Sequence, residues 1–257
     1  MSPGMTVLDF VRYRQNLRGT KIGCREGDCG ACTILVGELA GDTVKYRSMT
    51  SCLMPLANAA AKHIVTVEGV NPNDDSLTPV QQAMVDESGT QCGFCTVGFV
   101  MSLTGFCIDD NEKTPEMAVS SVDGNICRCT GYKAIERAAN SVCTYVTERR
   151  TGDRRSSPES AQTEAPSEIN ALKRAVETNI IPAYFSTVAG RLSALIEGKG
   201  KIEVRDPALV VGGGTDIYVQ KPDTMAESES AHLFFDDGLR GIRDSGEYIE
   251  IGASVTV

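Results

Sequence analysis

The chain has 257 residues, which gives room for about two domains at the usual ~150 residues per domain. Its formal net charge of −9 argues against nucleic acid or an anionic membrane surface as a partner. Residues 1–10 lack the basic and apolar regions of a secretory signal, and no apolar run approaches the ~20 residues that span a bilayer. We therefore expect a soluble, cytoplasmic protein.

Ten cysteines and only two histidines set the chemistry that the chain can perform. In a reducing compartment, clustered thiols indicate metal or redox work rather than disulfides. The histidines, His63 and His232, lie far apart in the sequence, which leaves little for histidine-centred acid–base catalysis. We expect a chain that moves electrons and leaves bond-making to another protein.

The N-terminal region carries a mixed α and β pattern. Residues 6–15 predict a short amphipathic helix with Thr6 as its N-cap. Alternating apolar residues predict a hairpin of strands over 31–39 and 43–47, and a further strand over 64–68.

A cysteine loop separates that helix from the first strand. It runs Gly23-Cys24-Arg25-Glu26-Gly27-Asp28-Cys29-Gly30-Ala31-Cys32, and Cys52 follows twenty residues later. The C-x4-C-x2-C spacing with a distant fourth cysteine is the plant-type pattern for a [2Fe–2S] cluster held by four thiolates. The glycines allow the loop to turn sharply and to point backbone N–H groups at sulfur. The predicted ligands are Cys24, Cys29, Cys32 and Cys52.

Helical signals replace strands after residue 71. Thr78-Pro79-Val80-Gln81 combines a capping box with proline at the first helical position, and its helix should extend to about Glu87. Further helices are predicted over 93–107, 115–121 and 131–147, the last with a regular apolar stripe. These elements predict a small helical bundle.

A second cysteine set lies within this bundle. It consists of Cys92-Gly93-Phe94-Cys95 and Cys127-Arg128-Cys129. Cys92 and Cys95 can share one face at the start of a helix, where the helix dipole favours thiolates. Cys127 and Cys129 must lie on a turn, with Gly124-Asn125 and Gly131 supplying flexibility.

Two pairs of thiols are enough for a second cluster, whose predicted ligands are Cys92, Cys95, Cys127 and Cys129. A four-thiolate zinc site is the alternative, although C-x-C is unusual for structural zinc. The remaining pair, Cys107 and Cys143, falls on apolar helical positions and is expected to serve as small buried hydrophobic residues.

A change of composition marks the end of the bundle. Residues 148–168 contain no Leu, Val, Ile, Met, Phe or Tyr and predict a flexible linker. Beyond it, residues 180–195 are expected to be partly helical, and 209–219 and 248–257 to be strands.

A third motif combines a strand with a glycine-rich turn: Leu209, Val210, Val211, Gly212, Gly213, Gly214, Thr215, Asp216 and Ile217. Bare backbone N–H groups in such a turn can approach a phosphate. The motif matches neither a Walker loop nor the G-x-G-x-x-G fingerprint. A plain structural turn is therefore the alternative.

Taken with their order, these motifs resemble the molybdenum hydroxylase family, and most closely the iron–sulfur and FAD subunit of its bacterial xanthine dehydrogenases. The residues that carry the resemblance are the segments 19–33, 79–84, 91–96 and 124–132. The match covers residues 5–147 almost continuously.

The resemblance implies an α+β multidomain chain. Its parts would be a ferredoxin-like β-grasp [2Fe–2S] domain over 1–71, a four-helix-bundle [2Fe–2S] domain over 72–147, a flexible linker over 148–170, and the start of a PCMH-type α+β FAD domain over 171–257.

The resemblance also implies partners. A large subunit would hold the molybdopterin cofactor and hydroxylate the substrate, so the assembly would be a hetero-oligomer. Electrons would pass through the helical-domain cluster, then the ferredoxin-like cluster, then FAD, and finally NAD. Gln91 would contact the pterin across the subunit interface, although an ordinary hydrogen bond at a helix start is the alternative. The glycine motif would bind the FAD pyrophosphate.

Other interpretations stay open. The partner could act on an aldehyde or an N-heterocycle instead of a purine, and the chain could be a stand-alone ferredoxin-like carrier or a degenerate fragment. The family usually begins with a β-hairpin before the helix that opens here at Thr6, and it continues past Val257 into a second FAD-binding region. We therefore expect a fragment that retains FAD weakly or not at all. Val97 also stands where the family usually has proline.

Overall fold

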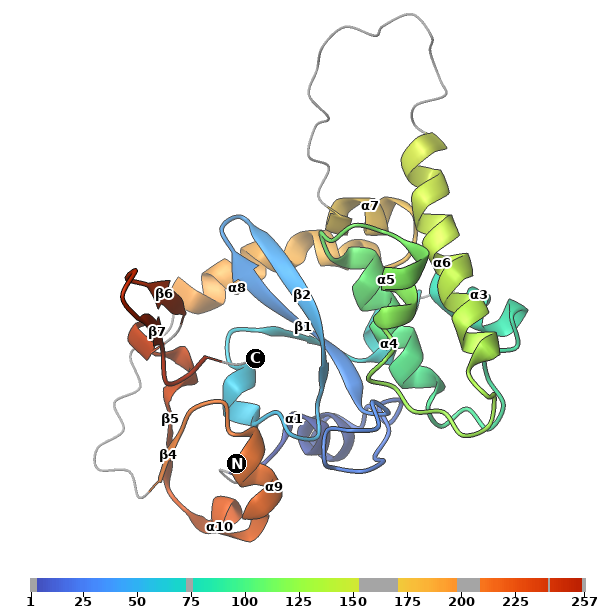
Figure 1. The fold of residues 1–257 in the computed structure, drawn as a ribbon. Helices are drawn as coiled ribbons and strands as arrows, with labels where there is room; N and C mark the ends of the chain where they lie inside the picture. Colours follow the sequence, from blue (N-terminus) through green and yellow to red (C-terminus); the bar gives the residue numbers. More distant parts are fainter. Residues whose placement is uncertain (1–3, 73–75, 153–170, 198–208, 240, 256–257) are drawn as a thin grey trace, which may run out of the picture.

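A computed structural model describes residues 4–72, 76–152, 171–197, 209–239 and 241–255. A three-stranded sheet lies at its centre, with helices α3 to α6 on one side and a smaller C-terminal unit on the other (Figure 1). None of the helices in these ranges is both long and apolar enough to cross a membrane. The linker was predicted to begin at residue 148, but residues 148–152 continue the preceding helix, and the part over 153–170 lies outside the described residues.

The N-terminal unit is built on an antiparallel sheet with the strand order β2-β1-β3. Its elements are α1 (Val7–Asp9), the π-helix η1 (Phe10–Arg14), β1 (Thr33–Ala40), β2 (Thr43–Thr50), η2 (Leu56–Ala59), β3 (His63–Val65) and α2 (Val67–Val70). Because side chains alternate across a strand, Ile34 and Val36 pack with α1 and η1 while Leu35 packs with the helices. The sheet is therefore covered on both faces.

Helices α3 (Pro79–Asp86), α4 (Thr96–Ile108), α5 (Pro115–Ser120) and α6 (Lys133–Gly152) form the second unit. The predicted capping box is confirmed, since Thr78 and Gln81 exchange both hydrogen bonds. Helix α4 is buried on all sides from Gly98 to Ile108, as expected for an apolar helix at the centre of a core. It contacts β1 and β2 on one side and the other three helices on the other.

Residues 171–197 belong to the same core. They form α7 (Ala171–Glu177), η3 (Ala183–Thr187) and α8 (Val188–Glu197). Phe185 packs on Tyr46 of the sheet, and the Tyr184 hydroxyl donates to the Gly69 carbonyl at 2.9 Å. Tyr145 of α6 donates to the Thr178 carbonyl at 2.9 Å. This segment therefore fastens onto both preceding units, while the division of the chain at residue 171 stays a prediction.

The C-terminal unit is small. It contains β4 (Leu209–Val211), α9 (Thr215–Gln220), α10 (Pro222–Glu227), β5 (Ser230–His232), η4 (Leu233–Phe235), η5 (Asp237–Leu239), β6 (Ile242–Asp244) and β7 (Ile249–Ile251). Strands β4 and β5 pair in parallel, joined by the two short helices, and β6 and β7 form an antiparallel hairpin. A small core of Val211, Tyr218 and Met225 holds the first pair together.

Several predicted boundaries are wrong. The strand expected over 64–68 ends at Val65, because the short helix α2 begins at Val67 with Thr66 as its N-cap. The strand expected over 209–219 ends at Val211, where the glycines turn the chain into α9. Only Ile249–Ile251 of the strand expected over 248–257 is formed among the described residues. Helix α7 has no counterpart among the predicted elements.

His63 lies at the junction of the sheet and the returning segment 171–197. Its Nδ1 is 2.8 Å from the Tyr46 hydroxyl, and its ring makes edge contacts with Tyr184 and Phe185. Burial among these rings lowers the pKa of His63 to about 4, and the nearby Arg191 guanidinium acts in the same direction.

This environment predicts a pH-dependent stability. The unfolded chain binds the imidazole proton near the ordinary value of about 6.5 and the folded chain only near 4, so the free energy of unfolding should fall as pH drops between these values. His63→Gln should make that fall shallower. Thermal unfolding of both proteins at about pH 7.5 and about pH 5 tests this, and an identical loss in both would contradict it.

Candidate metal centres

The β1–β2 hairpin brings the two buried cysteines of the first set together. Its register pairs Thr33 with Thr50, so Cys32 and Cys52 stand just beyond the paired ends. The Ser51 hydroxyl and N–H both donate to the Cys32 carbonyl, at 2.7 and 3.3 Å. Cys32 and Cys52, twenty residues apart in sequence, are therefore placed side by side by strand pairing.

The loop before β1 supplies the other two thiols. Arg25, Gly27 and Gly30 have φ values of 60°, 85° and 66°, which fold the loop tightly. Backbone N–H groups point at sulfur as expected: Glu26 N–H lies 3.3 Å from Cys24 Sγ, and Cys24 N–H lies 3.4 Å from Cys29 Sγ.

Thiol–thiol contacts shift the acidities in this set. A hydrogen bond from the Cys52 thiol lowers the pKa of Cys32, and the Ser51 backbone and side chain act in the same direction. The same contact raises the pKa of Cys52, as does burial. The negative charge of Cys24 acts on the pKa of Cys52 in the same direction.

The second set comes from two loops of the helical unit. Cys92 and Cys95 precede α4, and Cys127 and Cys129 lie between α5 and α6. Cys129 Sγ is 3.6 Å from Cys92 Sγ, and Cys95 hydrogen-bonds Cys127. The predicted turn for Cys127 and Cys129 is confirmed, but the helix begins at Thr96, so only Cys95 stands at its N-cap.

Hydrogen bonds orient the buried member of this set. The Thr130 hydroxyl lies 3.2 Å from Cys127 Sγ, and Cys127 N–H donates to the Tyr132 hydroxyl at 3.0 Å. Burial acts to raise the pKa of Cys127, but hydrogen bonds from Thr130 outweigh it and lower that pKa. Burial and the contact with Cys127 raise the pKa of Cys95 to about 12.

The arrangement fits a two-metal cluster. Within the described residues, no group of three or more Cys, His, Asp or Glu side chains is placed to hold one metal ion. In the first set, Cys24 N–H lies 3.4 Å from Cys29 Sγ, and Cys32 and Cys52 stand together beyond the paired ends of β1 and β2. A [2Fe–2S] cluster takes two thiolates on each of its irons, whereas zinc takes four around one centre. The plant-type C-x4-C-x2-C spacing of the first set favours the former.

The two sets meet through their backbones. Ile126 N–H, directly before Cys127, donates to the carbonyl of Cys29 at 3.0 Å. A Cβ on Gly98 of α4 would lie 2.2 Å from the Gly30 carbonyl oxygen, so only glycine allows this close approach. A Cβ built on Gly23 would lie 3.8 Å from the ring of Phe94. These contacts hold the first cysteine loop against the second.

The second set reaches the surface. Cys92 and Cys129 are exposed, as is Gln91, whereas Cys32 and Cys52 are buried. Three apolar side chains beside them are also about half exposed: Phe94 at 48%, Ile126 at 54% and Tyr132 at 45%. We call Phe94, Ile126 and Tyr132 the apolar collar.

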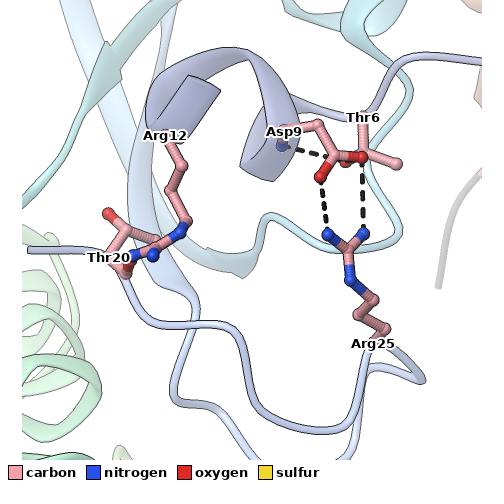
Figure 2. Close-up of polar contacts among 5 residues, drawn as sticks. All are labelled: Thr6, Asp9, Arg12, Thr20 and Arg25. Carbon is pink, nitrogen blue, oxygen red and sulfur yellow. Dashed lines mark hydrogen bonds and ion pairs between the residues drawn. The ribbon is translucent and has the colours of Figure 1, made fainter. Parts of the chain in front are cut away.

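A polar clamp, which the sequence patterns did not indicate, ties the first cysteine loop to α1 and η1 (Figure 2). The Arg25 guanidinium faces the Asp9 carboxylate with contacts of 2.7 and 3.4 Å. Asp9 is held in turn by Thr6 at the helix N-terminus. Arg12 of η1 donates to the carbonyls of Arg18 and Thr20 at the start of the loop.

The glycine-rich turn lies against the first unit. Gly214 has a φ of 90° and precedes α9, and a Cβ there would lie 2.8 Å from Pro55. The buried side chain of Asn58 donates from Nδ2 to the Gly213 carbonyl at 2.9 Å. The motif Leu209–Ile217 is therefore a strand, a turn and a helix start that sit beside the segment following Cys52.

Cys107 and Cys143 are both buried within the helical unit, as expected for small hydrophobic residues. Complete burial raises the pKa of Cys107 to about 12. A thiol held in this way is a poor metal ligand.

The clamp predicts how firmly the first loop is held. Arg25→Ala removes a partly exposed bidentate ion pair of about 0.5–1 kcal/mol, so loop opening should become about two- to fivefold more frequent. Iron release to a chelator, followed by the loss of visible absorbance, should accelerate by that factor. Arg14→Ala, on an exposed part of η1, is the control. Equal acceleration in both variants would contradict a role for the clamp.

Comparisons with known proteins agree with this geometry. Residues 1–57 match the family described as a 2Fe-2S iron-sulfur cluster binding domain, and residues 66–140 match a [2Fe-2S] binding domain. The chain is 43% identical over 142 residues to a xanthine dehydrogenase of Blastobotrys adeninivorans, covering 54% of this chain and 10% of that protein. It is 37% identical over 147 residues to aldehyde oxidase 4 of Cavia porcellus, covering 56% and 11%.

A solved structure, the aldehyde oxidoreductase of Desulfovibrio gigas, is similar at a TM-score of 0.51 and 25% identity, over 76% of this chain and 20% of that one. The chain thus spans about a tenth of the length of the sequence relatives that it matches. Both of its cysteine sets fall within the matched domains. Over this iron–sulfur region, which holds two matched [2Fe-2S] binding domains, the chain is similar to xanthine dehydrogenases and aldehyde oxidases.

Proposed function

We propose that this chain is the electron-transfer part of a molybdenum hydroxylase, carrying electrons through two [2Fe–2S] clusters from a molybdopterin-binding partner toward FAD and NAD. The observation that carries the proposal is the contact between the two cysteine sets, where Ile126 N–H meets the Cys29 carbonyl. From Cys127 Sγ, the path to Cys29 Sγ consists of covalent bonds and this one hydrogen bond.

Cys24, Cys29, Cys32 and Cys52 would hold one cluster, and Cys92, Cys95, Cys127 and Cys129 the other. When bound, each cluster supplies a one-electron carrier whose potential depends on exposure and on hydrogen bonds to sulfur. The chain's own residues hold the thiols in pairs and direct N–H groups at Cys24 and Cys29. Two complete sets with these supporting contacts favour a working relay over a degenerate fragment.

The exposed end of the relay is the place for the partner. Cys92 and Cys129 lie at the surface beside the apolar collar, and exposed apolar groups of this kind mark protein interfaces. A partner covering the collar would bring its pterin to the second set, within reach of the exposed Gln91. The relatives include both xanthine dehydrogenases and aldehyde oxidases, so the substrate of the partner could be a purine, an aldehyde or another N-heterocycle.

The other end of the relay would deliver electrons to FAD at the turn Gly212–Gly214. Asn58 supports this assignment, because it ties Gly213 to the segment that follows Cys52. A flavin phosphate on the backbone N–H groups of Leu209–Ile217 would then lie beside the segment that follows Cys52. NAD would be the final acceptor.

The metal content tests the proposal directly. Two [2Fe–2S] clusters require about four iron and about four acid-labile sulfide per chain. Cys52→Ser should remove the EPR signal of one of two distinguishable centres, because it removes one thiolate of the first set. Cys107→Ser is the matched control, since that thiol is buried in the helical core, and it should leave both signals. Zinc without iron, or equal losses in the two variants, would contradict the assignment.

Flavin binding tests the glycine turn separately. Added FAD should bind weakly, so the protein should quench the fluorescence of FAD. The FAD should then separate from the protein during gel filtration. Gly214→Ala should abolish the quenching, because φ is positive at this residue and a Cβ meets Pro55. Gly190→Ala, where a Cβ meets nothing within 4 Å, should bind FAD as the wild type does. Quenching that survives Gly214→Ala would separate FAD binding from this turn.

A further inference from the structure

Asn125 occupies the point at which the two cysteine loops meet. The sequence predicted that Gly124-Asn125 would supply flexibility to the turn before Cys127. In the structure Asn125 is only 5% exposed, and its side chain reaches from the second loop into the first. A buried amide with fixed partners is a constraint on a turn and not a source of flexibility.

The amide of Asn125 is held at both ends. Ser102 of α4 donates to Asn125 Oδ1 at 2.7 Å, which orients the amide. Its Nδ2 then donates to the carbonyl of Gly30 at 3.1 Å. Gly30 lies between Cys29 and Cys32, so one side chain connects α4, the second cysteine loop and the centre of the first.

The first loop packs closely against the second at this contact. A Cβ on Gly30 would lie 2.4 Å from Asn125 Nδ2, and one on Gly98 would lie 2.2 Å from the Gly30 oxygen. Thr33 closes the other side, donating from its hydroxyl and its N–H to the same carbonyl at 2.7 and 3.1 Å. The Gly30 carbonyl is therefore fixed by donors from both units.

We propose that Asn125, oriented by Ser102, is the positioning residue that sets the separation and relative orientation of the two clusters, and thereby their coupling. The proposal rests on the proposed function, in which one electron leaves the cluster of the second set and is taken up by that of the first, with no atom transferred. Asn125 contacts no sulfur in this role and acts through the Gly30 backbone. Its loss should leave all eight thiolates in place.

The test is EPR of the fully reduced protein, in which two neighbouring paramagnetic clusters split each other's signals. Wild type should show this splitting. Asn125→Leu, which is similar in volume but has no polar atoms, should keep its full iron and sulfide content and lose most of the splitting. Ser102→Ala should lose part of it, because the amide is no longer oriented, and it provides a milder variant if Asn125→Leu folds poorly.

Thr104→Val is the matched control. Thr104 is also buried on α4, but its hydroxyl bonds only to the Val100 carbonyl of the same helix. It should lower the unfolding temperature without changing the splitting. The proposal would be overturned if both Asn125→Leu and Ser102→Ala kept the wild-type splitting. It would also be overturned if Thr104→Val lost the splitting to the same extent, or if the wild-type protein showed two cluster signals without splitting. A wild-type protein without iron–sulfur signals would instead refute the proposed function.

Discussion

The carbonyls of Cys29 and Gly30 are the point on which the rest of this structure depends. Donors from the other unit, Ile126 N–H and the Asn125 amide, meet them, and Gly98 lets a helix backbone approach. Each cysteine set is positioned by different local structure. The strand register of the hairpin places Cys32 and Cys52 of the first set, and loops that flank helix α4 place the second set. The two sets are joined because backbone groups beside their cysteines are hydrogen-bonded to the other loop, and the bond from Asn125 to Gly30 lies in a buried region where such bonds are strong.

Sequence patterns predicted the elements that have a strong local cause. The capping box at Thr78, with its proline at the first helical position, and the alternation in β1 and β2 produced elements close to those expected. The predicted elements were wrong where tertiary contacts determine the secondary structure. The turn at Gly212–Gly214 ends β4 early, and α7 is helical because Ala175 packs into the core of the preceding units. Neither contact can be inferred from spacing.

In the candidate site, too, some residues could be predicted from the sequence and others could not. Cysteine spacing predicted the eight thiols, since wrapping a cluster demands that pattern, and they fall within the two matched [2Fe-2S] domains. It could not identify Asp9, Asn58 or Asn125, whose partners are far away in the sequence and whose residue types are common in ordinary turns. Asn125 shows the difficulty best: beside a glycine it has the composition of a flexible turn, and only its burial between two loops reveals a constraint.

The uneven burial of the cysteines has a consequence for how such a protein is made. Cys32 and Cys52 are buried at the end of the hairpin, whereas Cys92 and Cys129 are exposed to solvent. Oxidants attack accessible thiolates first. A centre at the second set would therefore be the more fragile one from the time of its insertion until a partner covers the apolar collar. Under the proposed function, this exposure would favour docking of the partner soon after both centres are inserted.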